Sequence, residues 1–198
     1  MSADTSADRG SAMAASLARA AQTRGVDRPG VALLSRAYAL AMAPRVEQLD
    51  DDHHPLYLHP GRTALILLRD AGVTEATVLA AACVTESEDE TFAVGEGDIR
   101  AALGGEIARL VASLPRPRSG TWVEDLVSAT EHVRLVVLAE RLDHLRHAHL
   151  RAAGEEWERA VHAEGGAVYL PVAERTNPTL ARRYRHWHRT FARRLGIA

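Results

Sequence analysis

Apolar residues recur at spacings of three and four along most of this chain of 198 residues, and no segment alternates apolar and polar residues for long enough to indicate a strand. Such spacing places apolar side chains on one face of an α-helix, where they can pack against neighbouring helices. The chain is therefore predicted to be all-α, with helices over residues 31–46, 61–71, 74–84, 98–114, 122–151 and 178–195.

Particular residue types indicate where several of these helices end. Pro44 is expected to end or bend the first helix, because proline has no amide hydrogen to donate. Gly72 follows the segment 61–71, and glycine commonly caps a helix C-terminus. The Pro/Arg/Gly run over residues 115–120 predicts a flexible loop. The long segment 122–151 has a broad apolar face, which is typical of a central, buried helix.

The chain is expected to form one domain preceded by a tail. Residues 1–29 are rich in Ser, Ala, Asp and Gly and predict a mobile N-terminal tail, although 13–23 could form a short helix. Residues 30–198 can bury one full core but are too few for two ordinary domains. We therefore predict a single α-helical domain over 30–198.

Cysteine usage and hydropathy indicate a compartment. The one cysteine, Cys83, lies within an apolar run, which excludes a disulfide framework and is typical of a reduced, intracellular protein. No stretch approaches the roughly 20 uninterrupted apolar residues of a membrane span. Asp4 and Asp8 lie where a secretory signal would carry cations. A cytoplasmic protein without membrane contact is expected.

The charge of the chain argues against nucleic acid as a partner. A formal net charge of -2 gives no overall attraction to polyanions. Every basic residue is arginine, which excludes a P-loop because that motif needs a lysine. The arginines over 175–194 accompany aromatic residues that occupy the apolar stripe of the last helix. They predict a solvated basic face, with phosphate contact or a protein partner as the alternatives.

A cluster of polar residues follows the apolar helix 74–84 directly, with the sequence Thr85-Glu86-Ser87-Glu88-Asp89-Glu90-Thr91. Carboxylates at a helix C-terminus oppose the helix dipole, so this placement favours a bound cation. The alternative, without a bound ion, is a solvated helix end.

This cluster, together with Tyr57-Leu58-His59-Pro60 before it and Leu138-Ala139-Glu140-Arg141-Leu142-Asp143-His144-Leu145-Arg146 after it, resembles the HD-type hydrolase domain of the RelA/SpoT family. That family, which includes the small alarmone hydrolases, removes pyrophosphate from the alarmone (p)ppGpp. The resemblance covers about residues 31–195 and implies an HD-domain helical bundle. In the family, a His before Pro, an adjacent His-Asp pair and a later Asp hold a manganese ion. A Glu-Asp pair orients the attacking water and the phosphate.

The chain departs from this pattern at the positions of the metal ligands and the catalytic residues. His59 is retained, while the His-Asp pair is replaced by Thr85-Glu86 and the Glu-Asp pair by Asp89-Glu90. Glu140 replaces the late Asp, and His144 replaces an Asn that contacts nucleotide in the family. The resemblance implies Mn²⁺ or another divalent cation as cofactor if the site is functional. The predicted metal ligands are His59, Glu86, Glu140 and His144, and the predicted catalytic residues are Asp89 and Glu90.

The histidines of the chain allow more than one interpretation. His59 could equally be a hydrogen-bonded core histidine. Glu140, His144 and His147 are spaced to share one helix face, so His144 could replace the lost imidazole at a remodelled site. His53 and His54, beside Asp50-Asp51-Asp52, form a second and looser candidate for metal binding.

Three functional hypotheses follow. The hydroxyl of Thr85 cannot replace imidazole as a ligand, and the acidic run 50–52 would repel a polyphosphate. Both changes favour a pseudo-hydrolase that has lost alarmone hydrolysis and acts as a binding or regulatory module, with a small molecule or a protein as partner. The alternative is an active metal-dependent phosphohydrolase with a remodelled site, acting on a different nucleotide or phosphoester. A third hypothesis is recruitment of the cavity for another reaction.

Overall fold

The computed structural model describes residues 2–46, 58–116, 120–151 and 153–197. Within these ranges every regular element is helical, which confirms the all-α prediction. No helix among the described residues is both long enough and apolar enough to cross a membrane.

The elements are α1 (Ser2–Thr23), α2 (Arg28–Val46), α3 (His59–Leu65), the π-helix η2 (Ile66–Ala71), α4 (Ala76–Val84), the short 3₁₀ turn η3 (Glu90–Phe92), α5 (Glu96–Leu103), α6 (Gly105–Ala112), α7 (Trp122–Ser128), α8 (Glu131–His147), the 3₁₀ turn η4 (Ala148–Leu150), α9 (Glu155–Glu164), the π-helix η5 (Gly165–Tyr169), α10 (Leu170–Thr176) and α11 (Pro178–Arg194).

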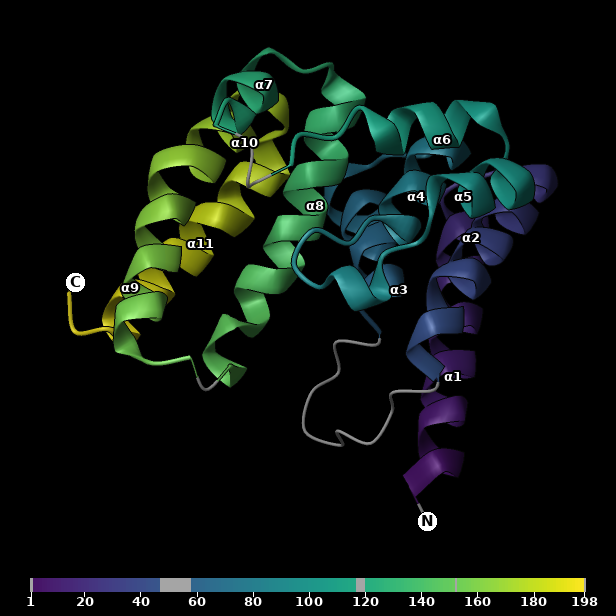
Figure 1. Ribbon diagram of the computed structural model, residues 1–198, viewed down its shortest axis with the longest axis horizontal. Helices are drawn as coiled ribbons and strands as arrows, with labels where there is room; N and C mark the ends of the chain where they lie inside the picture. Colours follow the sequence, from purple (N-terminus) through teal and green to yellow (C-terminus); the bar gives the residue numbers. More distant parts are fainter. Residues whose placement is uncertain (1, 47–57, 117–119, 152, 198) are drawn as a thin grey trace.

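Helix α8 runs through the middle of the bundle (Figure 1). On one side it packs against α3, η2 and α4, and on the other against α7, α10 and α11. Figure 1 shows α1 to α6 gathered on one side of α8, with α7 and α9 to α11 on the other. The two halves of the chain therefore meet at α8.

Helix α4 forms the centre of the first half. Its residues from Val78 to Val84 are all buried, and four other helices, α2, α3, α6 and α8, pack around it. A helix that is apolar on every side is stable only when it is surrounded in this way. Thr85 and the Glu86 side chain, which follow directly, are consequently held in the interior, whereas Ser87 and Glu90 are exposed.

Helix α11 holds α8 in place from the other half. Asn177 caps its N-terminus by accepting hydrogen bonds from the backbone of Thr179 and Leu180. The Tyr184 hydroxyl donates to the carbonyl oxygen of Leu138 at 2.7 Å, and the Trp187 indole donates to that of Leu145 at 2.7 Å. These two bonds bracket the part of α8 that carries Glu140 and His144. The predicted apolar stripe of this helix is buried, with Leu180, Tyr184, Trp187, Phe191 and Leu195 in the core.

Two long helices predicted from periodicity are each broken. The segment 98–114 divides into α5 and α6 at Gly104, whose φ of 99° lies outside the range that other residues readily adopt. The segment 122–151 divides into α7 and α8 because Ala129 is extended and the Thr130 hydroxyl caps α8, accepting a hydrogen bond from the Val133 amide. The prediction of one helix in each place is wrong.

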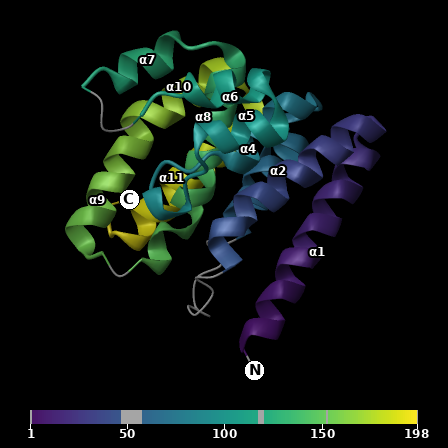
Figure 2. The ribbon, with the colours of Figure 1, turned by 45° about the vertical axis from the view of Figure 1, so that its right-hand side comes forward.

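Part of the segment 1–29, for which a mobile tail is predicted, is helical and packed in this structure. Residues 2–23 form α1, which lies beside α2 in both ribbon views (Figures 1 and 2). Leu17 and Ala21 of α1, with Val26 after it, are buried in the core. Alanine has high helix propensity, and the spacing of four between Leu17 and Ala21 places both on one helix face.

Candidate metal centre

Four side chains from three parts of the chain converge in the interior. They are His59 at the start of α3, Glu86 just after α4, and Glu140 and His144 on α8, and one ligand atom from each lies within 4.8 Å of all the others. Among the described residues this is the only such group of three or more metal-binding side chains. The structure thus brings together all four residues that the sequence predicts as ligands.

His59 is oriented by a carboxylate behind it. Its Nδ1 lies 2.9 Å from Oδ2 of Asp143, and both side chains are fully buried. Arg62 binds the same carboxylate through Nε and Nη2, each at 2.8 Å from one of the oxygens. Because Nδ1 is engaged, Nε2, which lies 3.4 Å from the Thr63 hydroxyl, is the nitrogen of His59 that could ligate a metal ion. A carboxylate on the far nitrogen of a ligating histidine is a common feature of metal sites.

Asp143 is ionised in this arrangement. Burial by itself would raise the pKa of Asp143, but hydrogen bonds from His59 and Arg62 and the charge of Arg62 outweigh it and hold the pKa well below its usual range. Asp143 was not among the predicted site residues. Its spacing from Glu140 is a signal that could have found it, because residues three apart share a helix face.

His144 lies between the two glutamates. Its Nε2 is 3.2 Å from Oε1 of Glu86 and 3.2 Å from Oε1 of Glu140, and its ring stacks on that of His59 with 4.2 Å between centroids. Neither ring nitrogen of His144 has an aligned hydrogen bond to any described residue, although both are buried. Buried polar atoms of this kind call for an explanation, and a site for a cation is one of the usual ones.

The protonation of these groups is coupled. Burial would lower the pKa of His144, but the charge of Glu140 and the contacts with Glu140 and Glu86 raise it to about 10. Burial would raise the pKa of Glu86, but contact with His144 and the charges of His59 and His144 bring it down to about 2. The pKa of Glu140 is likewise lowered, with burial outweighed by His144. A proton on His144 would balance the carboxylates, and a divalent cation would compete with that proton.

The glutamates have further partners that fix their positions. Oε2 of Glu86 accepts a hydrogen bond from Nη2 of the buried Arg45 at 2.9 Å, and Oε1 accepts one from the Glu88 amide at 3.0 Å. Oε1 of Glu140 accepts from both the amide and the hydroxyl of Ser87, at 3.1 and 2.6 Å. The turn after α4 therefore fixes the carboxylates of Glu86 and Glu140 by hydrogen bonds.

The predicted catalytic residues lie outside this group of four. Oδ1 of Asp89 accepts hydrogen bonds from the amide and hydroxyl of Thr91, which makes Asp89 the cap of η3. Glu90 is exposed and lines a cavity that also reaches Glu86 and Glu140. Their catalytic role stays a prediction. His53, His54 and the acidic run 50–52 lie outside the described residues.

A cavity of about 420 Å³ is lined by two of the four candidate ligands, Glu86 and Glu140. Ser87 and Glu90 also line it, and the rest of its lining is mostly apolar and aromatic. Besides Glu86, Ser87, Glu90 and Glu140, the described residues that line it are Val84, Thr85, Ala93, Val94, Val111, Leu114, Pro115, Arg116, Trp122, Val137 and Tyr169. A volume of this size falls within the range of small-molecule sites.

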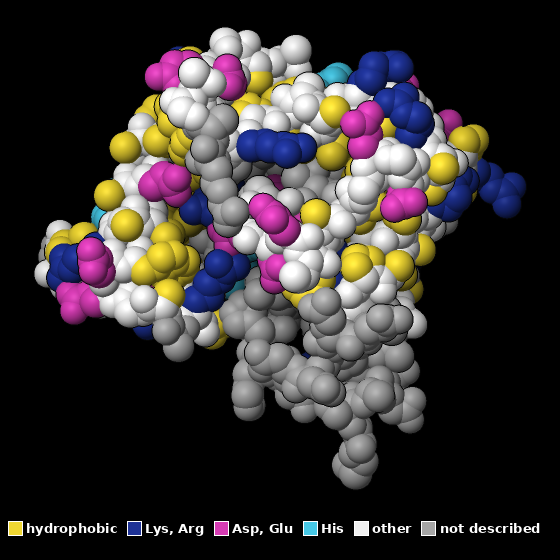
Figure 3. Space-filling view, in the orientation of Figure 1, with side chains coloured by type: hydrophobic (Ala, Val, Ile, Leu, Met, Phe, Trp, Pro, Cys, Tyr) yellow, Lys and Arg dark blue, Asp and Glu magenta, His cyan; other side chains and the backbone are white. Residues whose placement is uncertain are grey.

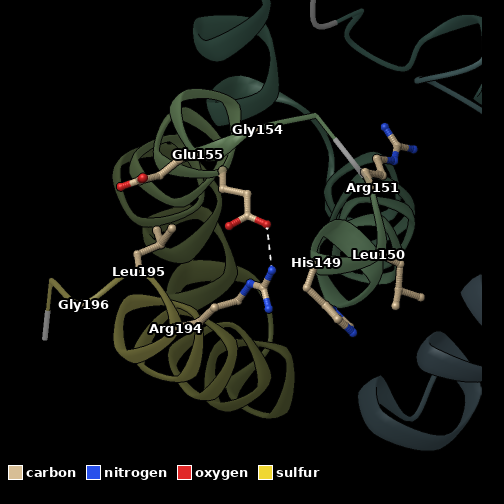
Figure 4. A pocket seen from close by; sticks show the side chains of 9 residues that line it. His149, Leu150, Arg151, Gly154, Glu155, Arg194, Leu195 and Gly196 are labelled. Carbon is tan, nitrogen blue, oxygen red and sulfur yellow. Dashed lines mark hydrogen bonds and ion pairs between the residues drawn. The ribbon is translucent and has the colours of Figure 1, made fainter.

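A larger hollow, of about 820 Å³, lies between η4, α9 and the end of α11 and is drawn in Figure 4. Arg194 and Glu158 form an ion pair across it at 3.1 Å. None of the four ligands lines it. On the face that Figure 3 shows, acidic and basic side chains of the described residues are interspersed rather than gathered into one basic field.

The donor set fits a divalent metal ion. Two imidazole nitrogens and two carboxylates suit borderline cations such as Mn²⁺, Fe²⁺, Co²⁺ or Zn²⁺. The carboxylate behind His59 and the unaligned nitrogens of His144 are further features of such a site.

The fold is that of an all-α HD-domain helical bundle, as predicted from the sequence. No protein-family model matches the chain, and no curated protein matches it. Among solved structures, it is similar to that of a metazoan ortholog of SpoT that hydrolyses ppGpp and plays a role in starvation responses. The TM-score is 0.59 at 17% sequence identity, and the match covers 87% of this chain and 98% of the other. A likeness at this identity concerns the fold.

Proposed function

We propose that the protein is a metal-dependent phosphohydrolase with a rearranged metal centre. The observation that carries the proposal is the convergence of His59, Glu86, Glu140 and His144 to within 4.8 Å in the protein interior. The family that the sequence resembles uses two imidazoles and two carboxylates. The same count of two and two is kept here, with one imidazole supplied by α8 instead of by the residue after α4.

The chemistry would follow from a cation at this centre. A divalent ion there would polarise a phosphoryl oxygen and lower the pKa of a water molecule. His59 is held for this task by Asp143 and Arg62, and Glu86 and Glu140 are held by Arg45 and Ser87. Glu90, on the wall of the same cavity, would orient the attacking water and accept its proton.

The walls of the cavity favour a phosphoester with an apolar or aromatic organic group, such as a nucleotide. Trp122 and Tyr169 pack against each other with 5.8 Å between ring centroids and both line the cavity. Aromatic faces stack on flat apolar groups. Among the described residues of the lining, Arg116 is the single arginine. A substrate with fewer negative charges than (p)ppGpp matches this lining best.

A second candidate is the pseudo-hydrolase. The ion pair between Arg45 and Glu86 favours it, because a guanidinium already neutralises one carboxylate of the cluster. With a proton on His144, the cluster is balanced without metal. In this case the cavity would bind a ligand or the surface a protein partner, without hydrolysis.

Metal content separates the two candidates. Elemental analysis of the purified protein, before and after incubation with Mn²⁺, is expected to give about one ion per chain. His59→Ala should abolish it, whereas His132→Ala, an exposed histidine at the start of α8, should not. The metal-loaded protein should then hydrolyse a member of a panel of nucleoside monophosphates and aryl phosphates. Absence of metal from the native protein would leave the pseudo-hydrolase as the better proposal.

A further inference from the structure

A second carboxylate, Glu88, faces the other nitrogen of His144. Its Oε2 lies 3.4 Å from Nδ1 of His144. Both atoms are buried, and neither has an aligned hydrogen bond with any described residue. Glu88 does not correspond to a functional position of the resembling family and was not among the predicted site residues.

Two arginines hold Glu88 against His144. Arg141 contacts Oε1 of Glu88 through Nη1, and Arg151 approaches Oε2 through Nη2 at 2.5 Å. Both guanidinium groups rest on aromatic rings, that of Arg141 at 5.3 Å from the centroid of Tyr169 and that of Arg151 at 5.8 Å from that of Trp157. Arginine stacked on a ring is partly immobilised, so the Glu88 carboxylate is fixed at this place.

The arrangement resembles the one around His59, with a longer contact of 3.4 Å between carboxylate and Nδ1 in place of 2.9 Å. There, Asp143 contacts Nδ1 of the imidazole and is itself bound by Arg62. At His144, Glu88 is the carboxylate and Arg141 and Arg151 are the arginines. A carboxylate beside Nδ1 keeps the proton on that nitrogen and leaves the lone pair of Nε2 for a metal ion. Nε2 of His144 is the nitrogen that faces Glu86 and Glu140.

We propose that Glu88 is a positioning residue that holds His144 in the tautomer and orientation needed to ligate a divalent cation. The proposal rests on the proposed function, since it presupposes that the cluster binds metal. A chain that moved an imidazole to α8 would need a new carboxylate to orient it, and the turn after α4 supplies one. The competing role for Glu88 is to neutralise Arg141 and Arg151, without any effect on His144.

Glu164 offers a matched control. Its Oε2 accepts from Nη2 of Arg141 at 2.8 Å, so it shares an arginine with Glu88. It is not among the contacts of His144. Glu88→Gln and Glu164→Gln therefore each remove one negative charge from Arg141, but only the first changes the group beside Nδ1.

The test compares wild type, Glu88→Gln, Glu88→Asp and Glu164→Gln in titrations with Mn²⁺ and Co²⁺. Calorimetry gives the affinity, and the visible spectrum of bound Co²⁺ reports ligand geometry. Glu88→Gln is expected to bind about 10- to 100-fold more weakly, with a changed Co²⁺ spectrum. Glu88→Asp, which keeps the charge, should recover part of the affinity, and Glu164→Gln should bind as wild type does. Thermal unfolding of each metal-free variant shows whether it is folded.

The outcomes distinguish the two proposals. If wild type binds neither Mn²⁺ nor Co²⁺, the proposed function fails and the role of Glu88 with it. If wild type binds metal and Glu88→Gln binds equally well, only the role of Glu88 is overturned. Equal weakening in Glu88→Gln and Glu164→Gln would also overturn it, because both would then act through Arg141.

Discussion

At the scale of single residues, the relation between Thr85 and His144 is central. Thr85 occupies the place where the resembling family has a metal-binding histidine, and its hydroxyl instead donates to the carbonyl oxygen of Ala81 at 2.7 Å. His144 brings an imidazole into the same cluster from α8. Thr85 and Glu86 line one cavity, so a larger side chain at 85 has room beside the carboxylates.

A swap of these two residues tests the relation. His144→Asn, which restores the residue type of the family, is expected to lower Mn²⁺ affinity at least 100-fold because it removes a ligand. Thr85→His combined with His144→Asn should recover part of that loss, since an imidazole at 85 would approach Glu86 and Glu140 from α4. Mn²⁺ titration by calorimetry checks both.

Thr85→His alone is the control for the swap, and it should leave the affinity within a few-fold of wild type. If the double variant is folded but its Mn²⁺ affinity does not recover, the site is not a rearranged form of the metal site of the resembling family.

That His59, Glu86, Glu140 and His144 lie together could be predicted, because they stand in motifs whose order along the chain is informative. Asp143 and Glu88 could not be predicted from motifs, because their role depends on contacts across the fold. Asp143 reaches His59, 84 residues earlier, and Glu88 is held by Arg141, 53 residues later. Spacing along α8 places Asp143 on the same face as Glu140, but it does not show that Asp143 reaches His59 or that Glu88 reaches Arg141.

At the scale of elements, periodicity predicts that a segment is helical better than it predicts that the helix is continuous. Apolar residues continue at helical spacing through Gly104 and through Ala129 and Thr130, yet the backbone turns at both places. A single glycine or threonine inside a helical pattern is compatible with either outcome, and the packing of the neighbouring helices selects the break.

The approach of η5 to α11 depends on a glycine. A Cβ built on Gly165 would lie 2.4 Å from Cζ3 of Trp187, whose indole is buried and bonded to Leu145. Gly165→Ala is therefore expected to lower the free energy of unfolding by about 1–3 kcal/mol. Gly97→Ala on α5, where nothing lies within 4 Å, should cost nothing. Urea denaturation gives the free energy of unfolding of both variants. If Gly165→Ala is as stable as Gly97→Ala, Trp187 moves aside freely.

The contact of α9 with α11 should also make stability depend on pH. His188 stacks on His162 with 3.9 Å between ring centroids, and burial together with His162 lowers the pKa of His188. The unfolded chain then binds more protons below about pH 6.5, so this group makes stability fall as the pH drops through that value.

His188→Gln removes that contribution, and its free energy of unfolding should decline less than that of wild type between pH 7 and pH 5.5. Urea denaturation at a series of pH values measures the slope, and His186→Gln, an exposed residue on the same helix, is the matched variant. An unchanged slope in His188→Gln would remove the stacked pair as a cause.

At the scale of the whole molecule, the proposed metal centre lies where the two halves of the chain meet. Its four candidate ligands come from α3, from the turn after α4 and from α8, and α8 is anchored from the other half by Tyr184 and Trp187. Such a site exists only in the folded protein, so metal binding should add to the stability of the whole bundle.

Helix α1 should stabilise this bundle, whereas a mobile tail would have no effect on its stability. Leu17 of α1 is 1% exposed, and Met13 lies so close to Gly61 that a Cβ there would be 2.4 Å from its Cγ. Gly61 is two residues after His59, so α1 covers the element that begins with a ligand. Leu17→Ala is expected to lower the free energy of unfolding by about 2–5 kcal/mol. The exposed neighbour Gln22→Ala should change it by less than about 0.5 kcal/mol. Because metal binds only the folded state, saturating Mn²⁺ should raise the stability of Leu17→Ala and wild type alike. If Leu17→Ala and Gln22→Ala have the same free energy of unfolding in urea, α1 does not pack against the core in solution.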